Sequence, residues 1–213
     1  MYVIEFPDPE LANEDGLLAV GGNLHTDTLL NAYRSGIFPW SVDPISWWSP
    51  DPRAVFELSE FRLSRRMQRL YRSGRFSFSF DECFTRVMEC CAAPAPGRES
   101  TWISKKFIKA YTALHNQGYA HSCEIWNDEK QLVGGVYGVA IGAFFAGESM
   151  FHTCSNASTL ALNHLIEHLR QCGYLLFDSQ VISSHTASLG AIEIPRYEYL
   201  RRLRTALAKN CAF

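Results

Sequence analysis

Residues 131–151 of this 213-residue chain read QLVGGVYGVAIGAFFAGESMF, and we expect them to form the centre of its fold. The run is almost entirely apolar and glycines interrupt it, a pattern typical of buried strands separated by turns. The preceding segment AHSCEIWND, residues 120–128, also has the composition of a strand. Strands that follow one another so closely along a chain usually pair antiparallel. We therefore expect an antiparallel meander at the centre of the fold.

Helices and further strands flank this meander. An amphipathic helix is expected in SKKFIKAYTALHNQG (104–118) and a capped one in NASTLALNHLIEHLRQCG (156–173), each ended by glycine. Other expected helices run from about Asp81 to Cys91 and onward from about Arg196. Strands are expected in RFSFSF (75–80) and YLLFDSQV (174–181). This order predicts the α+β class, with helices packed on a mixed sheet over residues 56–213.

Residues 1–55 have a different composition, rich in glycine, proline and aromatic residues, and we expect them to form a small N-terminal α/β domain. Its one helix is TDTLLNAYRSG, residues 26–36, which Thr26 or Asp27 can cap and Gly36 can end. The segment GIFPWSVDPISWWSPDPRAVF, residues 36–56, holds three tryptophans and four prolines. It predicts either a proline-rich loop whose rings fill a small core or a platform on which nucleotide bases stack.

Composition excludes several classes of protein. The chain has no run of eighteen apolar residues, and its start, MYVIEFPDPE, is acidic rather than basic and apolar, so we expect a soluble cytoplasmic protein without a membrane partner. Its seven cysteines are odd in number and form no CxxC, which argues against a disulfide framework and a zinc knuckle. A net charge of −2 means that a polyanionic partner must bind a local patch.

RLSRRMQRLYRSGR, residues 62–75, is such a patch, with six arginines and no acidic residue. On one helix, a stripe of arginines would lie opposite a buried stripe formed by Leu63, Met67, Leu70 and Tyr71. Guanidinium groups suit phosphate, so the segment is either a phosphate-binding face or a solvated helix face. The arginines of the stripe are Arg62, Arg65, Arg66, Arg69 and Arg72.

Three acidic or polar constellations can carry chemistry. Asp178 and Gln180 are two apart on an expected strand, so they project from one face and can form a polar pair. Glu148 follows an apolar strand, and His185 lies in the loop that follows Gln180. The string His164-Leu-Ile-Glu-His168 matches one metalloprotease pattern, but both histidines flank an apolar helical stripe, which favours an ordinary helix surface. We expect no metal site.

A set of segments makes a resemblance specific. From about Phe6 to Arg196, the chain resembles the leucyl/phenylalanyl-tRNA–protein transferase family. The segments that carry it are GLLAVGGNL, AYRSGIFPW, WWSPDPRAVF, TWIS, YGVAIGAFFAGESMF, NAS and FDSQVISSHTASLGAIEIPR. The resemblance implies a GNAT-like acyltransferase domain after the N-terminal domain. It also implies transfer of Leu or Phe, and less well Met, from aminoacyl-tRNA to the N-terminal Lys or Arg of proteins, which marks them for N-degron-dependent degradation.

The resemblance also implies roles for individual residues. Asp178 and Gln180 would handle the acceptor amine as catalytic residues, and Glu148 would hold its cationic end. Trp40 and Trp102 would hold the terminal adenosine. The aminoacyl side chain would enter a pocket formed by Val136, Met150, Leu162, Leu165 and Phe177. Since the donor ester is already activated, neither ATP nor a cofactor is expected, and the chain has no P-loop.

Two other functions stay open from the residues alone. An acyl-CoA-dependent N-acetyltransferase would need a glycine-bearing turn for pyrophosphate, but no glycine occurs between Gly147 and Gly173. A non-catalytic tRNA-binding module would keep the arginines and tryptophans but would have no use for a buried Asp178 and Gln180.

Overall fold

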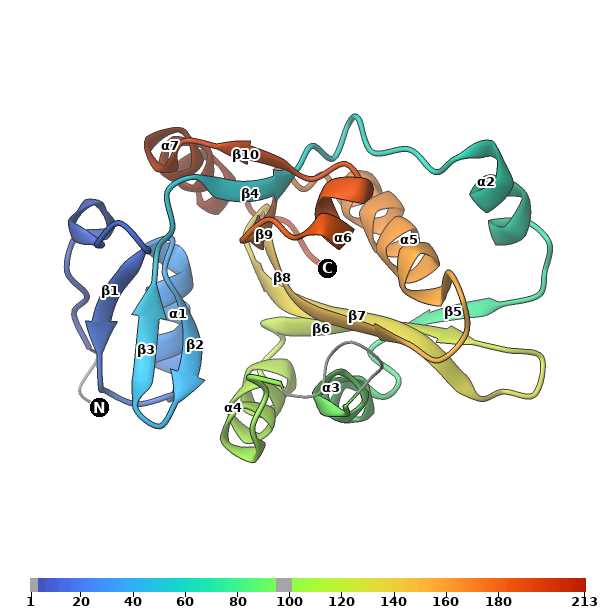
Figure 1. Ribbon diagram of the computed structural model, residues 1–213, viewed down its shortest axis with the longest axis horizontal. Helices are drawn as coiled ribbons and strands as arrows, with labels where there is room; N and C mark the ends of the chain where they lie inside the picture. Colours follow the sequence, from blue (N-terminus) through green and yellow to red (C-terminus); the bar gives the residue numbers. More distant parts are fainter. Residues whose placement is uncertain (1–3, 95–100) are drawn as a thin grey trace.

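A computed structural model describes residues 4–94 and 101–213. Within these residues a seven-stranded sheet has the order β10-β4-β9-β8-β7-β6-β5 (Figure 1). Its strands are β4 (Arg53–Phe56), β5 (Ser77–Phe80), β6 (Ala120–Trp126), β7 (Leu132–Ile141), β8 (Phe144–His152), β9 (Leu176–Gln180) and β10 (Ile192–Ile194). β8 and β9 run parallel, and the other described neighbours run antiparallel. The predicted meander is thus β6-β7-β8, and the mixed sheet is confirmed.

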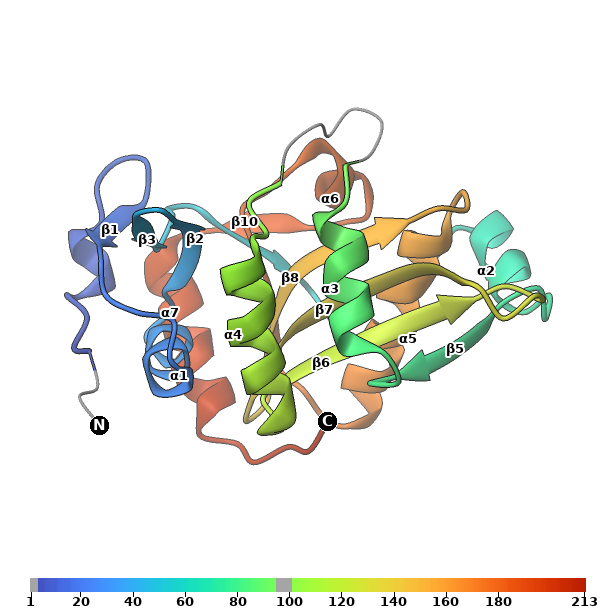
Figure 2. The same ribbon diagram turned by 90° about the horizontal axis from the view of Figure 1, so that it is seen from below.

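Helices cover both faces of this sheet. α3 (Phe84–Ala92) and α4 (Lys105–Asn116) lie side by side on one face, and α5 (Ala157–Gln171) lies on the other (Figures 1 and 2). Along β7, Tyr137 and Val139 join the buried cluster under α3 and α4, whereas Val136 and Ala140 join the cluster under α5. Alternate residues of β7 therefore pack into the two cores on opposite faces of the sheet. This arrangement confirms the α+β class.

Glycine allows the close contact between β7 and β8. A Cβ atom built on Gly138 would lie 2.2 Å from the carbonyl oxygen of Ala146 and 2.5 Å from the Phe145 ring. Any larger residue would force the two strands apart. The glycines of the opening stretch are therefore needed within strands as well as at turns.

A second sheet forms from the N-terminal residues. Its described strands, in the order β1-β3-β2, are β1 (Leu17–Val20), β2 (Phe38–Val42) and β3 (Ile45–Trp48), preceded by a 3-10 turn, η1 (Pro9–Leu11). The tryptophan-rich segment is thus a β-hairpin rather than a loop. Pro39 lies on the edge strand β2, where a missing N–H is tolerated.

The helix of the N-terminal part, α1 (Thr26–Arg34), is capped differently from the prediction. Thr26 and Asp27 lie inside the first turn, and His25 holds the cap position without a side-chain bond. The Asn23 side chain instead accepts hydrogen bonds from His25 N at 3.0 Å and from Thr28 Oγ1 at 2.9 Å. Gly36 follows the helix with φ +77°, as expected of a helix-ending glycine.

The two sheets share one buried core. Leu29, Tyr33 and Trp47 from the N-terminal part belong to the same hydrophobic cluster as Tyr111 of α4 and Tyr199 of α7 (Arg196–Leu207). The boundary expected at residue 55 lies inside β4, which pairs with β9 and β10 in the larger sheet. β4 therefore connects the N-terminal part directly to the interior of the molecule.

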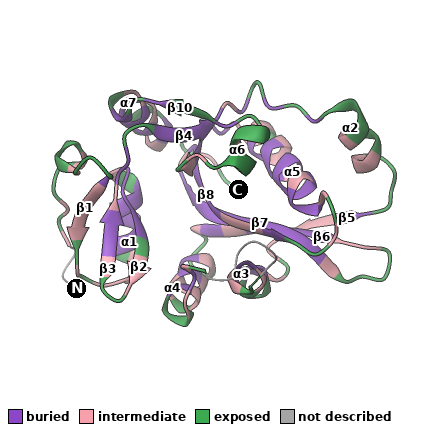
Figure 3. Ribbon diagram, viewed as in Figure 1, coloured by how far each residue is buried: buried purple, intermediate pink, exposed green. Residues whose placement is uncertain are grey.

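The arginine helix is shorter than the pattern predicted. α2 spans Arg65–Tyr71, because the Ser64 side chain caps it by accepting from Met67 N. Arg62 and Leu63 precede the helix, so the prediction of one stripe that includes Arg62 is wrong. α2 has no buried residue and lies at the outer edge of the molecule (Figure 3). Met67, Leu70 and Tyr71, which were expected to form a buried stripe, are therefore only half-buried.

No helix within the described ranges, 4–94 and 101–213, combines the length and apolar character that a membrane span requires.

Candidate functional site

A cavity of about 420 Å³ opens where β8 and β9 separate. The two strands pair from Phe144 with Leu176 as far as Ala146 with Asp178. The cavity lies beyond that point. Its walls are formed by Phe38, Pro39, Trp40, Phe56, Trp102, Val136, Gly147, Glu148, Ser149, Met150, Leu162, Phe177, Ser179, Gln180, Val181, Ser183, His185 and Thr186.

Glu148 enters this cavity from a bulge in β8. Tyr137 of β7 lies opposite Ser149 and Gly138 lies opposite Gly147, so Glu148 has no partner across the strands. An extra residue in one strand bends it and redirects a side chain, and such bulges are frequent next to active sites. The bulge explains how a carboxylate in a buried strand comes to face a cavity.

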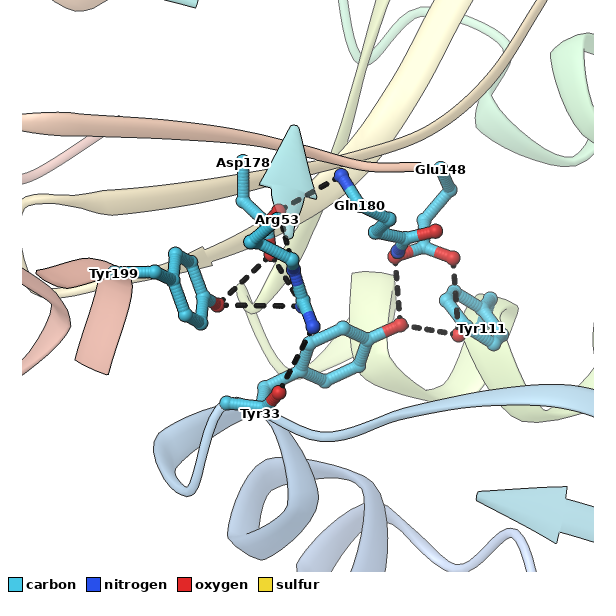
Figure 4. Close-up of polar contacts among 8 residues, drawn as sticks. Tyr33, Arg53, Tyr111, Glu148, Asp178, Gln180 and Tyr199 are labelled. Carbon is cyan, nitrogen blue, oxygen red and sulfur yellow. Dashed lines mark hydrogen bonds and ion pairs between the residues drawn. The ribbon is translucent and has the colours of Figure 1, made fainter. Parts of the chain in front are cut away.

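Three polar side chains donate hydrogen bonds to Glu148 (Figure 4). Its Oε1 accepts from Tyr33 OH at 2.7 Å and from Gln180 Nε2 at 2.8 Å, and its Oε2 accepts from Tyr111 OH at 3.3 Å. The hydroxyls of Tyr33 and Tyr111 also contact each other. Burial raises the pKa of Glu148 to about 8, although the hydrogen bond from Tyr33 opposes the rise. The cavity therefore holds a carboxyl group that titrates near neutral pH.

Asp178 lies beside the cavity rather than in it, with no exposed surface. Arg53 binds it through Nε to Oδ1 at 2.9 Å and Nη2 to Oδ2 at 2.7 Å. Tyr199 OH also donates to Oδ2 at 2.9 Å, and the backbone N of Gln180 donates to Oδ1 at 2.8 Å. All four hydrogen bonds come from the protein.

The expected polar pair between the Asp178 and Gln180 side chains is therefore wrong. Gln180 has φ +64°, so the strand alternation that predicted one shared face does not reach it. Its backbone bonds to Asp178 while its side chain turns to Glu148. Only Gln180 and Glu148 of the three predicted catalytic residues line the cavity.

The tryptophans divide between core and cavity. Trp47 is buried, with an edge contact to Phe6 and its Nε1 donating to the Gly21 carbonyl. Trp40 is 38% exposed and lines the cavity, as does the half-buried Trp102. Trp102 in turn packs edge-on against Phe107, with the two ring centroids 5.1 Å apart. Trp47 thus fills the core, whereas Trp40 lines the cavity, and base stacking on its ring stays a prediction.

Most of the expected apolar pocket comes together at one end of this cavity. Val136, Met150, Leu162 and Phe177 line it, and Phe38 and Phe56 do so too, although neither was predicted. Leu165 does not line it: it is 1% exposed and packs in the cluster between α5 and the sheet. It is one turn further along α5 than Leu162, which takes it away from the cavity.

The arginines fall on two separate surfaces. Arg66, Arg69 and Arg75 line an open hollow of about 750 Å³ together with the turn that precedes α5. Arg62 and Arg72 line a smaller hollow of about 260 Å³ beside Arg170. The arginines of the predicted stripe, including Arg65, are exposed.

The two histidines of the metalloprotease-like string serve packing. His164 stacks on Phe78 and Phe80, and Tyr71 OH lies 2.6 Å from its Nδ1. His168 packs against Phe80, and burial lowers the pKa of both histidines. They are half-buried rather than on an ordinary helix surface. Within the part of the chain that the structure describes, no three His, Cys, Asp or Glu side chains could hold a metal ion.

Known proteins share this sequence closely. The family model described as leucyl/phenylalanyl-tRNA protein transferase matches residues 55–204, and the model of its N-terminal domain matches residues 22–51. The leucyl/phenylalanyl-tRNA–protein transferase of Shewanella halifaxensis is 50% identical over 202 residues, covering 93% of this chain and 85% of that protein. The enzyme of the same name from Cellvibrio japonicus is 48% identical, covering 95% and 87%.

Solved structures align more distantly. FemX aligns with a TM-score of 0.49 at 14% identity, covering 80% of this chain and 66% of that one. The structure of L-PGS from Bacillus licheniformis aligns with a TM-score of 0.45 at 10% identity, covering 77% and 55%. The family models and the two transferases, which extend over nearly the whole sequence, are decisive. The chain belongs to the leucyl/phenylalanyl-tRNA–protein transferase family.

Proposed function

We propose that this aminoacyl-tRNA–protein transferase moves Leu or Phe, and less well Met, from charged tRNA to the N-terminal Lys or Arg of acceptor proteins and so marks them for N-degron-dependent degradation. One observation carries the proposal. A single cavity joins an apolar floor, two tryptophan rings and a buried carboxyl group, Glu148. These three features match the three parts that must meet in the reaction, namely the aminoacyl side chain, the terminal adenosine and the cationic acceptor.

The donor occupies the cavity from the floor outward. Its side chain rests on Val136, Met150, Leu162 and Phe177, four apolar residues that line the cavity. Its adenine stacks on Trp40 or Trp102, a contact worth about 1 to 3 kcal/mol per base. The ester carbonyl then lies between the floor and the polar wall, which is formed by Glu148 and Gln180. Leu165 stabilises the floor from behind and does not touch the donor.

The acceptor approaches from the polar wall. An entering Lys or Arg side chain places a positive charge beside Glu148, which favours the carboxylate form of that group. In the net reaction the α-amine nitrogen bonds to the ester carbonyl carbon, the ester C–O bond breaks, and an amine proton ends on the departing ribose hydroxyl. Gln180 orients the amine, and Asp178 acts from behind without contacting either substrate.

The tRNA body lies across the exposed arginines. Arg66 and Arg69 line the hollow before α5, and β8 leads from that hollow to the cavity. Arg65 adds to this surface, whereas Arg62 and Arg72 bind a second stretch of backbone phosphate. Because its donor is charged tRNA, we place the enzyme in the cytoplasm.

One reconstituted reaction tests the proposal. Purified protein is mixed with radiolabelled Leu-tRNA and either a peptide that starts with Arg or the same peptide starting with Glu. Label should move to the Arg peptide alone. Turnover of acetyl-CoA instead would favour an N-acetyltransferase, and tRNA binding with no transfer would favour a binding module; either result would contradict the proposal.

A further inference from the structure

Arg53 is a buried charge that the reaction just described does not use. Its side chain is 1% exposed and lies between the rings of Phe38, 4.7 Å from the centroid, and Tyr199, 4.4 Å from the centroid. Its Nη1 donates to the carbonyl of Gly36 at 3.1 Å, and its other two nitrogens bind Asp178. Burying an ion pair costs free energy that the attraction between the charges does not always repay, so the pair needs a purpose other than stability.

The ion pair bears on the backbone at Gln180, two residues after Asp178. Gln180 has φ +64°, a backbone conformation that is unfavourable for a residue with a side chain. The hydrogen bond from Gln180 N to Asp178 Oδ1 closes this turn. The pairing of β4 with β9 also shifts register here, between Ala54 and Val55. Arg53 therefore holds the same carboxylate oxygen, Oδ1, that holds the turn.

The turn decides where the Gln180 amide points. With Gln180 in this conformation, its Nε2 reaches Glu148 Oε1 at 2.8 Å (Figure 4). An extended residue at this position would continue the strand alternation and lose that contact. Arg53 therefore affects the contact between Gln180 and Glu148 indirectly, through Asp178 and the backbone of Gln180.

We infer that Arg53 is a positioning residue for aminoacyl transfer: its ion pair with Asp178 holds the left-handed backbone at Gln180 and so places the Gln180 amide on Glu148. The inference rests on the proposed function, in which Gln180 and Glu148 contact the acceptor. It also assigns Asp178 to positioning rather than to proton transfer, because each of its oxygens already accepts two hydrogen bonds and it does not line the cavity.

A double-mutant cycle tests whether Arg53 acts through Gln180. Wild type, Arg53→Met, Gln180→Ala and the double variant are compared in single-turnover transfer from Leu-tRNA to an Arg peptide, with enzyme in excess. Arg53→Met should lower the rate at least about 100-fold in the wild-type background, because small displacements of reacting groups are costly. In the Gln180→Ala background the same change should cost less than about 3-fold, because the two losses are not additive when one residue acts through another. Equal losses in both backgrounds would overturn the inference, whereas failure of wild type to transfer would refute the proposed function instead.

Arg196 provides a matched control for a merely structural role. It is also a buried arginine that donates to a backbone carbonyl, that of Ser49 at 2.7 Å, but it does not contact Asp178. Arg196→Met should lower the melting temperature as Arg53→Met does while keeping the transfer rate within about 3-fold of wild type. If it slows transfer as much as Arg53→Met, the effect is general destabilisation and the inference is wrong.

Arg53→Lys keeps the test decisive if Arg53→Met does not fold. Lys retains the charge but not the two-nitrogen fork that binds both oxygens of Asp178. The rate should fall about 10-fold or more at saturating Leu-tRNA while the KM for Leu-tRNA is unchanged, because Arg53 itself does not line the cavity. A wild-type rate for Arg53→Lys, or a loss confined to KM for Leu-tRNA, would overturn the inference.

Discussion

At the scale of single residues, the site separates its two carboxylates by environment. Asp178 is enclosed by Arg53, Tyr199 and a backbone amide, whereas Glu148 is bound by neutral partners and faces the cavity. An opposite charge favours ionisation and burial opposes it. Under the proposed function, Glu148 is thus the carboxyl group whose protonation would respond to an incoming acceptor, and Asp178 would be a fixed part of the scaffold.

Glu148 should leave a signature in the pH dependence of stability. Burial raises its folded-state pKa from 4.5 to about 8, so between these values the folded protein keeps a proton that the unfolded chain releases. The stability from this group is fully present below the lower value and is lost as pH rises to the upper one. The free energy of unfolding of wild type, measured with urea, should therefore include a decrease with rising pH that is absent in Glu148→Gln.

The comparison between the two proteins cancels the histidines, which titrate in both. From about pH 5 to about pH 9, the free energy of unfolding of wild type should fall relative to that of Glu148→Gln and then level off once the pH exceeds the raised pKa. A difference that is constant over this range would contradict the raised pKa.

Met150 should set which amino acid the donor site accepts. It lines the apolar floor, and Met150→Ala leaves part of the cavity unfilled, which should weaken Leu more than Phe. Ile and Val carry a branch at Cβ that a floor shaped for Leu would exclude, so they should be poor donors to the wild type. The measurement is competition among tRNAs charged with Leu, Phe, Met, Ile and Val for one Arg peptide. We expect the Leu to Phe ratio to fall about 10-fold in the variant, as for loss of a few methylenes.

Leu165→Ala is the control for this prediction. It removes an apolar side chain from the same layer, but Leu165 does not line the cavity. The variant should lose stability and keep the wild-type Leu to Phe ratio. A shifted ratio in Leu165→Ala, or equal use of Ile and Leu by wild type, would contradict selection by the shape of the floor.

At the scale of elements, the site is made by two strands that part. β8 and β9 pair through Ala146 and Asp178, and after that β8 bulges at Glu148 while β9 ends in the left-handed Gln180. α5, the crossover between them, supplies Leu162 to the floor. The same short stretch of sheet therefore provides both the cavity and its polar wall, where the proposed function places the donor and the acceptor.

α2 is the element that should govern tRNA affinity. Its arginines are exposed, and its helix has no buried residue, so charge reversal at Arg65, Arg66 and Arg69 should not unfold the protein. The triple Glu variant should bind tRNA more weakly, and each lost phosphate contact should reduce the salt slope by about 0.7 to 0.9. Filter binding at several salt concentrations gives both quantities.

The matched control reverses three exposed charges elsewhere, Arg86, Lys105 and Lys109 on α3 and α4. It makes the same change in net charge and should leave the salt slope near that of wild type. If both triple variants lose affinity equally, net charge rather than α2 governs binding.

At the scale of the whole molecule, the two sheets should unfold together. One hydrophobic cluster contains Leu29 and Trp47 of the N-terminal part as well as Tyr111 and Tyr199, and Arg53 connects Gly36 to Asp178. Separating the parts would expose this core. We expect a single cooperative thermal transition, as for small domains with one core.

Two probes can check this. In a Trp102→Phe, Trp126→Phe background, the remaining tryptophans all lie in the N-terminal part, so fluorescence reports that part while far-UV circular dichroism reports the whole chain. Coincident midpoints are expected. An earlier fluorescence transition would mean that the N-terminal part is an independent domain.

Most of the elements and the family could be predicted from the order of the amino acids alone. Apolar periodicity and glycine ends predicted α4, α5 and the β6-β7-β8 meander, because the spacing of apolar residues differs between helices and strands and can be recognised locally. Motifs such as FDSQVISSHTASLGAIEIPR pointed to the transferase family, which the family models confirmed.

Which side chains meet depends on how the elements pack in three dimensions, and it could not be predicted from local patterns. Arg53 and Asp178 are 125 residues apart, and Tyr33 and Glu148 are 115 apart, so no local pattern predicts that they pair. The bulge at Glu148, the turn at Gln180 and the exclusion of Leu165 from the cavity are equally non-local. Local periodicity tells which face of an element is buried, but the partner that buries it depends on how the strands and helices pack, and at this site packing separates Asp178 from the cavity and leaves Glu148 within it.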